Sequence, residues 1–256
     1  MSDNPEINGP PIGSNPMPGR DVMKEDFGWE VPVETVPVPS QGKVYPANSS
    51  LCNRETIDIY AMTAKQEDIL TSRALIKQGR VISELIRSCI VDRNVDPGDM
   101  LLGDRNALMI AVRITGYGSG YNAEVTCPAC SQKSSHTFKL TALPIKRLEL
   151  DPVSPGENLF EFELPVTKKK FKFKFLTGND ERELSIIAER KKKSMPGLEV
   201  DNIITSRLTA AIVSIDGIED RSKIAMFVSK MPALDSRKLR SHIDSHEPGI
   251  LMSSWM

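Results

Sequence analysis

The sequence predicts an α+β fold: a helical subdomain followed by two β-hairpins and a C-terminal helical segment, with an extended N-terminal arm. Apolar residues recur at helical spacing between residues 63 and 114 and again after residue 180, which is the pattern of amphipathic helices. Two stretches between residues 121 and 176 alternate with a period of two, as half-buried strands do. The first 40 residues hold eight of the 18 prolines, and such a segment buries too little apolar surface to offset its ordering entropy.

These features predict four parts along the chain. They are a Pro-rich disordered or extended arm over residues 1–45, a mainly helical part over 46–120, two β-hairpins including a CxxC knuckle over 121–176, and a C-terminal helical part with an apolar tail over 177–256. Within the arm, Phe27–Val33 is apolar enough to dock on the protein's own core or on a partner, and an unstructured linker is the alternative. The tail, with Ile250–Met252 and Trp255, has the pattern of a strand whose partner is missing.

The helical part begins with a turn at Ser40–Lys43 and an alternating strand over Thr56–Tyr60. Thr63 and Gln66 then have the spacing of a capping box, which opens a helix that runs to about residue 78 and ends at Gly79. Its expected buried stripe consists of Ile69, Leu70, Ala74 and Ile76.

Two further helices are predicted, over residues 81–91 and 104–115. In the first, Cys89 falls on the apolar face and is expected to be a small buried hydrophobe. In the second, Asp104 has the position of an N-cap, and Gly116 that of the left-handed residue that ends a helix. Between them, Asp96 followed by a proline predicts a short turn of helix.

The first predicted hairpin pairs Tyr121–Thr126 with Ser134–Leu140 around a turn that carries Cys127 and Cys130. The second pairs Asn158–Leu164 with Lys170–Leu176. In the second hairpin phenylalanines alternate with glutamates on one strand and with lysines on the other, which predicts a buried phenylalanine face and a solvated face of facing opposite charges.

The C-terminal part predicts four helices. Asp180 with Glu183 caps the first, which ends near Pro196. Apolar positions then mark one helix over residues 203–212, one around 224–228, and one over 234–243 that is opened by Asp235 or the proline before it.

Cys127 and Cys130 are the candidate metal ligands, and zinc is the candidate cofactor. Two cysteines two residues apart at a hairpin tip form one knuckle of a zinc ribbon, because both thiolates can reach one tetrahedral ion. A closed structural site has four ligands, and the sequence shows no second pair. His136 is a candidate third ligand, and a surface histidine on a strand is the alternative. Cys52 is a further candidate ligand, and a cysteine that binds no metal is the alternative there.

The composition argues against several classes of function. The formal net charge is −1, from 33 basic and 34 acidic residues, so no global charge attracts nucleic acid or an acidic membrane. Aromatic residues make up 5% of the chain and there are three histidines, which is little material for base stacking or general-base catalysis. No secretory signal, membrane-spanning run or catalytic motif of the common classes is found, so we expect a soluble intracellular protein without a catalytic site. The basic runs at Lys168–Lys174 and Arg190–Lys193 are expected to be a paired strand face and a helix end.

Several blocks of the sequence resemble the T4-type phage baseplate hub assembly proteins. The blocks are MTAKQEDILTSRALIKQG (62–79), GDRNALMIAVRITGYG (103–118), VTCPAC (125–130), FLTGNDEREL (175–184) and LDSRKLR (234–240). The resemblance covers about residues 40–250 and implies a non-enzymatic tail-morphogenesis protein that works in the infected bacterial cytoplasm. It also implies that relatives continue past Pro248-Gly249-Ile250 into a second Cys-x-x-Cys. If this sequence is truncated, Cys127 and Cys130 are half of a four-cysteine site; if it ends naturally, the hairpin is metal-free or binds zinc weakly.

Two functions of different classes follow. The first is an assembly factor or structural component of the baseplate hub. It would scaffold other hub and wedge proteins through protein–protein surfaces, as an oligomer or a single copy. It would act in the host cytoplasm during assembly, and both retention in the tail baseplate and release from it are left open. Neither nucleic acid nor membrane is an expected partner. The alternative is a zinc-ribbon nucleic-acid-binding module that uses the two basic runs, and its binding would weaken steeply with salt.

Overall fold

The structure is a computed structural model that describes residues 24, 27–194 and 203–252. The chain forms two units, residues 1–32 and 33–256. In the first unit the side chains of Phe27 and Trp29 are exposed, and Lys24 forms an ion pair with Glu30. Most of the predicted arm, residues 1–23 and 25–26, lies outside the described residues, as does Trp255 of the predicted tail.

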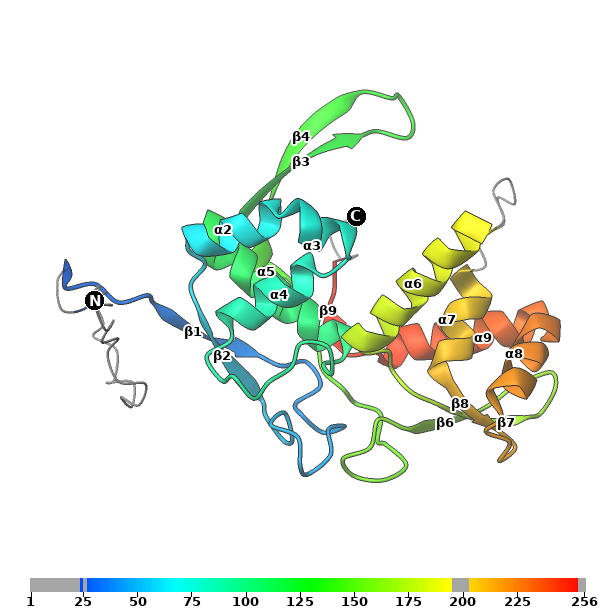
Figure 1. Ribbon diagram of the computed structural model, residues 1–256. Coiled ribbons are helices and arrows are strands. Elements are labelled where there is room, and N and C mark those ends of the chain that lie inside the picture. Colours follow the sequence, from blue (N-terminus) through cyan, green and yellow to red (C-terminus); the bar gives the residue numbers. More distant parts are fainter. Residues whose placement is uncertain (1–23, 25–26, 195–202, 253–256) are drawn as a thin grey trace, which may run out of the picture. The chain divides into compact units, whose positions relative to one another are not determined.

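The second unit is an α+β assembly, which confirms the predicted fold class (Figure 1). Its described strands form four small antiparallel sheets, ordered β1-β2, β3-β4, β5-β9 and β6-β7-β8. The strands are β1 (Val33–Pro37), β2 (Thr56–Tyr60), β3 (Gly120–Thr126), β4 (Lys133–Lys139), β5 (Ile145–Lys146), β6 (Phe160–Glu163), β7 (Lys170–Phe173), β8 (Ile212–Ile215) and β9 (Gly249–Ile250). The helices are α2 (Ala64–Thr71), α3 (Arg73–Lys77), α4 (Val81–Cys89), α5 (Leu102–Tyr117), α6 (Gly178–Ser194), α7 (Ile203–Ala211), α8 (Arg221–Lys230) and α9 (Ala233–His246), with a 3-10 turn η1 (Leu140–Ala142). None of the described helices has the length and apolarity needed to cross a bilayer.

The predicted boundary of the arm at residue 45 is wrong. β1 pairs with β2 from Val33, opposite Tyr60, to Pro37, opposite Thr56. The chain then enters the core, where Val38, Val44 and Tyr45 are buried. The prolines misled the prediction because β1 has a partner on one side only, and proline is tolerated in an edge strand.

The turn predicted at Ser40–Lys43 is confirmed. Gln41 and Gly42 have φ values of 56° and 70°, in the left-handed region that favours glycine. A Cβ on Gly42 would lie 2.3 Å from the backbone nitrogen of Arg54, so this turn also packs too closely for any larger residue.

The helix predicted to run to residue 78 is two helices, because Ser72 adopts an extended conformation between α2 and α3. The Thr71 hydroxyl donates to the carbonyl of Glu67 at 3.2 Å, and such hydroxyls compete for helical backbone groups. Thr63 N donates to Gln66 Oε1 at 3.0 Å, as the predicted capping box requires. Ile69 and Leu70 are partly buried, but Ile76 is 57% exposed and Ala74 is also exposed, so the last two do not belong to the buried stripe as predicted.

Three further local predictions around α5 are wrong. The segment after Asp96 is a turn, in which the Asp96 carboxylate accepts a hydrogen bond from Gly98 N at 2.8 Å. Helix α5 starts two residues before Asp104 and is capped by Leu101, and it ends at Gly118, which has a φ of 79°. The helix extends through Gly116.

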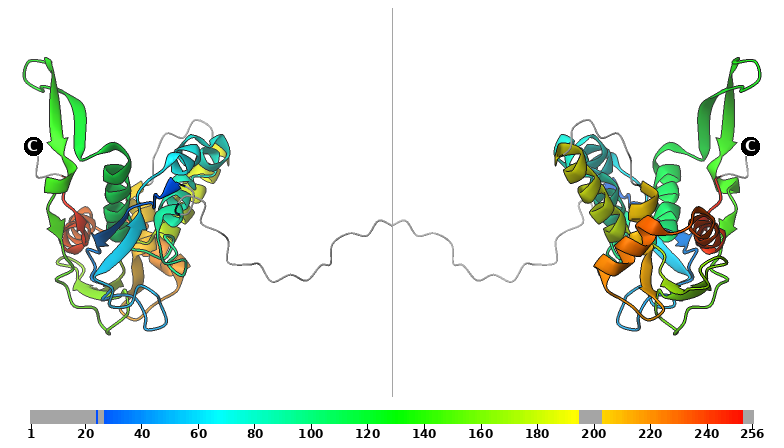
Figure 2. Two further views of the ribbon diagram at one scale, coloured as in Figure 1. Left: turned by 90° about the vertical axis from the view of Figure 1, so that its left-hand side faces the viewer. Right: turned by 90° about the vertical axis from the view of Figure 1, so that its right-hand side faces the viewer.

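The β3–β4 hairpin has the predicted position. Its register runs from Gly120 opposite Lys139 to Thr126 opposite Lys133. Nearly all of its residues are exposed, and Figures 1 and 2 show it extending beyond the helices. The hairpin therefore lies outside the core, although its strands are the regular elements that the sequence predicts.

The second hairpin has the predicted pairing, with Glu161 opposite Lys172 and Phe160 opposite Phe173. Its sheet has a third strand that the sequence analysis missed. The helix predicted over 203–212 ends at Ala211, and Ile212 begins β8, which pairs with β7. Ile212 and Phe173 are both fully buried at this pairing, so tertiary burial and the β-branched run favour the strand.

The remaining predicted helices are present as α6, α8 and α9, and the end predicted for α6 near Pro196 lies outside the described residues. Thr177, rather than Glu183, is the capping partner of Asp180, whose Oδ2 accepts from Thr177 N at 2.9 Å. The expectation of a C-terminal strand without a partner is wrong, because Ile250 of β9 pairs with Ile145 of β5.

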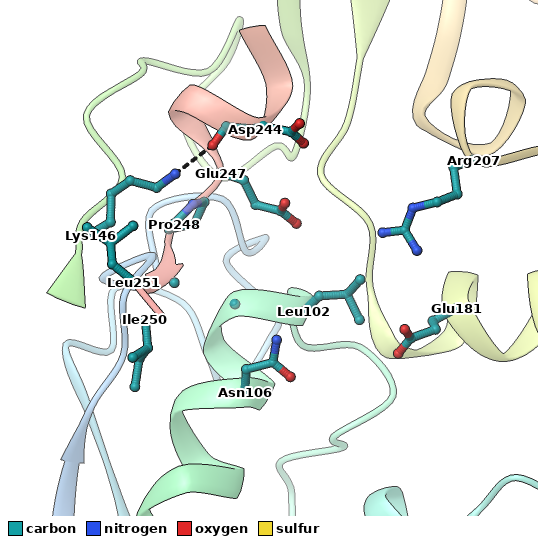
Figure 3. Close-up of a pocket in the computed structure, with 12 residues that line it drawn as sticks. Leu102, Asn106, Lys146, Glu181, Arg207, Asp244, Glu247, Pro248, Ile250 and Leu251 are labelled. Atoms are coloured by element: carbon teal, nitrogen blue, oxygen red, sulfur yellow. Dashed lines mark hydrogen bonds between the residues drawn. The ribbon is translucent and has the colours of Figure 1, made fainter. Parts of the chain in front are cut away.

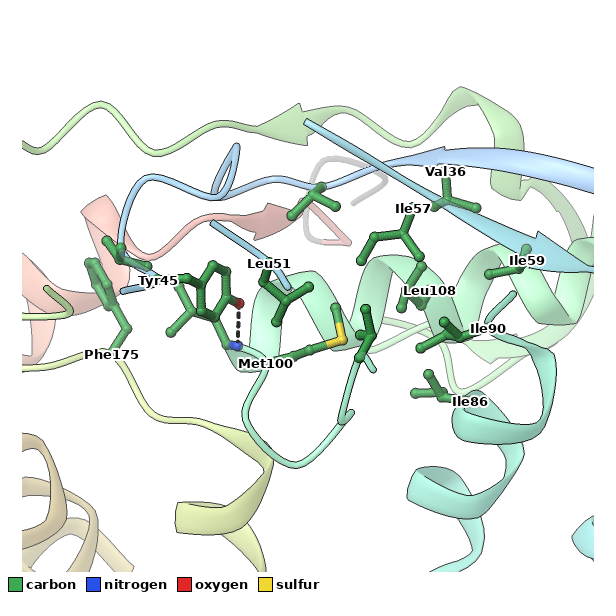
Figure 4. Packing of buried hydrophobic residues seen from close by; sticks show 14 of the residues in the cluster. Val36, Tyr45, Leu51, Ile57, Ile59, Ile86, Ile90, Met100, Leu108 and Phe175 are labelled. Atoms are coloured by element: carbon green, nitrogen blue, oxygen red, sulfur yellow. Dashed lines mark hydrogen bonds between the residues drawn. The ribbon is translucent and has the colours of Figure 1, made fainter. Parts of the chain in front are cut away.

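The main hydrophobic core is formed by β1, β2, α4, α5, β6 and β7 (Figure 4). Ile59, Ile86 and Leu108 are at most 1% exposed within it. Cys89 is also fully buried, which confirms its predicted role as a small hydrophobe. A second cluster forms where α7, α8 and α9 pack on the three-stranded sheet.

Candidate functional site

Residues Gly103–Leu108 lie in the first turns of helix α5, at a junction of distant segments. Asp104, predicted as an N-cap, is instead the third helical residue and is 1% exposed. Its carboxylate accepts from Ser40 N at 2.8 Å, from Ser40 Oγ at 2.6 Å and from the Tyr45 hydroxyl at 2.6 Å. The Tyr45 hydroxyl in turn accepts from Leu101 N at 2.8 Å. Asp104 thus ties the turn after β1 to the start of α5.

The electrostatics of this junction follow from its burial. Burial raises the pKa of Asp104, although the three donors favour its charged form. Burial and the adjacent Asp104 carboxylate raise the pKa of Tyr45 well above its ordinary value. A buried, fully hydrogen-bonded carboxylate of this kind fixes the relative position of two segments, and we assign it a structural role.

Gly103 brings the C-terminal strand against the same helix. A Cβ at this position would lie 1.7 Å from Pro248 O and 3.0 Å from Gly249 Cα, so only glycine permits this approach. Arg105, two residues further on, is largely buried, with Nη2 donating to Ser83 Oγ at 3.1 Å. The block therefore joins the turn after β1, α4 and β9 through consecutive residues.

A pocket of about 320 Å³ lies beside this junction (Figure 3). Lys146 Nζ donates to the carbonyl of Asp244 at 2.7 Å across one wall, while Glu181, Arg207 and Glu247 face the same space. Burial raises the pKa of Glu247, and Arg207 opposes that shift. The charged residues among those that line the pocket are Lys146, Glu181, Arg207, Asp244 and Glu247.

A second, larger hollow of about 570 Å³ lies along α8. Its floor is apolar, and we call it the α8 groove. Lys223 and Lys230 border it on the same helix, and Met226 between them is 62% exposed. The described residues that line it are Thr167, Ile215, Ile218, Lys223, Ile224, Met226, Phe227, Lys230 and Pro232.

The β3–β4 turn brings the predicted metal ligands Cys127 and Cys130 together. Cys127 N donates to Gln132 O at 2.9 Å, and Ser131 N donates to Cys127 O at 2.8 Å. Ser131 has a φ of 58°, which lets the chain reverse within the turn. The backbone N–H groups of Cys130 and Ala129 point at the Cys127 sulfur and lower the pKa of its thiol. Such N–H···S contacts stabilise a thiolate, the form that binds zinc.

The other candidate ligands are not brought to this pair. His136 lies opposite Ala123 in the hairpin, and its Nε2 is 2.9 Å from Ser134 Oγ. Among the residues that the structure describes, no group of three or more histidines, cysteines or carboxylates, with or without Cys52, could hold a metal ion. The donor set at the tip therefore suits zinc in kind and is incomplete in number.

The basic run at Lys168–Lys174 is largely paired. Lys169 lies 2.7 Å from Asp216, Lys172 lies 3.8 Å from Glu161, and Lys174 lies 2.7 Å from Asp180. Of these three pairs, only Lys172–Glu161 joins the facing strands as predicted from the sequence, whereas the partners of Lys169 and Lys174 lie on other segments of the chain.

Sequence reasoning missed Gly103 as a packing residue, and it missed two buried acceptors. One is Asp104. The other is Asp235, whose carboxylate accepts from Val166 N at 2.9 Å and from Thr167 N at 3.0 Å. Both aspartates stand near helix starts, where a capping role is the ordinary expectation, and their partners are 59 to 69 residues away in sequence. No short-range signal could have identified them.

Comparison with known proteins gives one match. Residues 33–159 match the family model described as T4 bacteriophage base plate protein. No curated protein and no solved structure matches the chain. The matched region runs from β1 to the residue before β6 and contains the Asp104 junction and the whole β3–β4 hairpin.

Proposed function

Because the chain belongs, through residues 33–159, to the T4 bacteriophage base plate protein family, we propose that it is a non-enzymatic assembly factor or structural component of the baseplate hub. Family membership supports a structural role in the phage baseplate, with other baseplate proteins as partners. In the finer proposal, the protein holds hub subunits in a geometry that the wedges and remaining hub proteins then join. It does so first in the host cytoplasm and afterwards within the tail.

The observation that carries this proposal is the position of the family's matched region in the fold. That region contains the Asp104 junction, which ties the turn after β1 to α5 through three short hydrogen bonds. It also contains the exposed β3–β4 hairpin. A rigid body that presents an exposed two-stranded ribbon is suited to contact with other subunits, because both outer strand edges can accept a partner strand.

The α8 groove is the second proposed contact surface. Apolar surface that stays exposed, as at Met226 and Ile218, marks interaction sites. Lys223 and Lys230 border this surface, so charge complementarity favours an apolar segment that carries acidic residues. We assign the groove to such a segment of another baseplate protein.

The nucleic-acid alternative is less well supported. Three lysines of the Lys168–Lys174 run lie within 4 Å of carboxylates, so fewer charges remain to release counterions from a phosphate backbone. Binding of duplex DNA measured at several salt concentrations separates the two functions. Tight binding at physiological salt with a steep salt slope, in the absence of any bound tail protein, would favour the alternative.

The proposal is tested by co-purification of tail proteins from infected cells, identified by mass spectrometry. The full-length protein should retain hub or wedge proteins. The arm is tested by deleting residues 1–32, which leaves β1 and the second unit intact. Recovery of DNA or polymerase without tail proteins would overturn the proposal.

The groove is tested in the same assay by Met226→Asp, with Met252→Asp as the matched control. Both methionines are exposed, at 62% and 56%, and only Met226 lines the α8 groove. A carboxylate at position 226 replaces exposed apolar surface with a group that is costly to bury, and it can pair with Lys223 and Lys230 in place of an acidic partner segment, so Met226→Asp should reduce recovery of at least one tail protein while Met252→Asp does not. Equal recovery with both variants would refute the groove assignment.

A further inference from the structure

The tip of the β3–β4 hairpin presents half of a tetrahedral thiolate site. Cys127 and Cys130 stand on one tight turn that two backbone hydrogen bonds close, from Cys127 N to Gln132 O and from Ser131 N to Cys127 O. These bonds close the turn that carries both cysteines, and the side chain of Cys130 forms a hydrogen bond with that of Cys127, so the two side chains are neighbours. Zinc bound by protein thiolates is almost always four-coordinate in structural sites, and two donors are therefore still required.

The described part of this chain does not supply the two missing donors. No group of three or more potential ligands is found among the described residues. His136 is the nearest candidate in sequence, but its pair with Ala123 lies three pairs away from the Thr126–Lys133 pair at the tip. At about 3.4 Å per residue this corresponds to roughly 10 Å along the backbone, and no described group of three ligands includes His136 with the two cysteines.

The tip is accessible to another molecule. Cys130 is exposed and Cys127 is partly exposed, and nearly every residue of β3 and β4 is exposed. Next to the tip, Lys133 Nζ lies 2.7 Å from Glu124 Oε1, so the local charges cancel and two such tips can approach without like-charge repulsion. An isolated two-stranded hairpin is only marginally stable in water, and a bound partner or metal would stabilise it.

We propose that the hairpin tips of two copies of this chain bind one Zn²⁺ between them, each copy supplying Cys127 and Cys130. A second copy offers two thiolates in the same geometry, which is the number and kind of donor that the site lacks. The arrangement is isologous, as in most homodimers, because the same surface of each copy makes the contact. Four thiols become thiolates, and their protons pass to the buffer as the metal binds. This dimer does not depend on the baseplate role.

The test uses the full-length, reduced, metal-free protein, titrated with Zn²⁺ or with Co²⁺ as a spectroscopic probe. Metal content per chain and sedimentation mass are measured on the same samples. We expect saturation at one metal per two chains, a Co²⁺ spectrum with thiolate charge-transfer bands, and a zinc-dependent shift from 28.4 kDa to twice that mass.

Matched variants separate the tip from the rest of the chain. The double change Cys127→Ser and Cys130→Ser should abolish stoichiometric metal binding and the mass shift together, while Cys52→Ser and His136→Ala should retain both. Circular dichroism shows whether each variant is folded. One metal per chain on a monomer would overturn the proposal, as would a metal-independent mass or metal-linked dimerisation that survives in the double variant.

Discussion

The approach of the C-terminal segment to α5 is tested most directly by Gly103→Ala. The added Cβ would lie 1.7 Å from Pro248 O, whereas ordinary contact begins at 3.4 Å, so the chain at Pro248 must retreat by about 1.7 Å. That retreat disturbs the β5–β9 pair, including the bond from Leu251 N to Pro144 O at 2.9 Å. Overpacking costs about 1–3 kcal/mol, and each weakened hydrogen bond costs about 1 kcal/mol.

The higher helix propensity of alanine acts in the opposite direction, so the sign of the change in the free energy of unfolding distinguishes the two effects. In a helix without this contact, Gly→Ala is stabilising by about 1 kcal/mol, because alanine has the higher helix propensity. With the contact, we expect a net loss of roughly 2–4 kcal/mol in the free energy of unfolding. Urea unfolding followed by circular dichroism measures this loss. Asn106→Ala, at an exposed position of the same helix, is the control and should change stability by less than about 0.5 kcal/mol. A Gly103→Ala protein as stable as the native one, or more stable, would refute the reasoning.

Three further changes test the buried carboxylates and the charged pocket. Asp104→Ala removes the acceptor of three hydrogen bonds and should destabilise the fold by about 3–5 kcal/mol in urea unfolding; a loss below about 1 kcal/mol would contradict its role. Asp235→Ala leaves two backbone N–H groups at the β6–β7 turn without their acceptor and should cost about 1–3 kcal/mol, seen also as faster amide exchange at Val166 and Thr167. Burial raises the pKa of the Glu247 carboxyl from its ordinary value of 4.5, so the folded state binds the carboxyl proton more tightly than the unfolded state does. The contribution of Glu247 to stability is therefore greatest below pH 4.5, and it is lost as the pH rises through the raised pKa. Glu247→Gln should therefore gain stability relative to the native protein between pH 3.5 and pH 7, and a difference in melting temperature that is independent of pH would exclude this effect.

Several features could be predicted because neighbouring residues encode them. The alternating phenylalanines of 158–176 require a two-stranded pairing with one buried face, and β6 and β7 have that register. The Thr63–Gln66 capping box and the Cys127–Cys130 turn depend on spacings of three residues, which local geometry alone satisfies.

The wrong predictions arose where a local sequence pattern was compatible with two structures and a contact with a distant residue determined which one formed. Proline content suggested a disordered arm up to residue 45, but pairing with β2 makes Val33–Pro37 a strand. Helical periodicity extended to Ile212, but this residue pairs with Phe173 at the edge of β7 and therefore belongs to strand β8. Local propensities differ by less than about 1 kcal/mol per residue, so burial of a single apolar side chain outweighs them.

The sequence by itself determined the α+β class, both hairpins, the cysteine pair at the tip of the first hairpin and the baseplate family model that residues 33–159 match. Only the tertiary structure decided that Asp104 is a buried acceptor for Ser40 and Tyr45, and that Gly103 admits the C-terminal strand. The physical reason is the sequence separation between the contacting residues. Periodicity and capping act over at most a few residues, whereas these contacts join positions 59 to 145 residues apart, and nothing in a local pattern specifies which distant donor or carbonyl will arrive there.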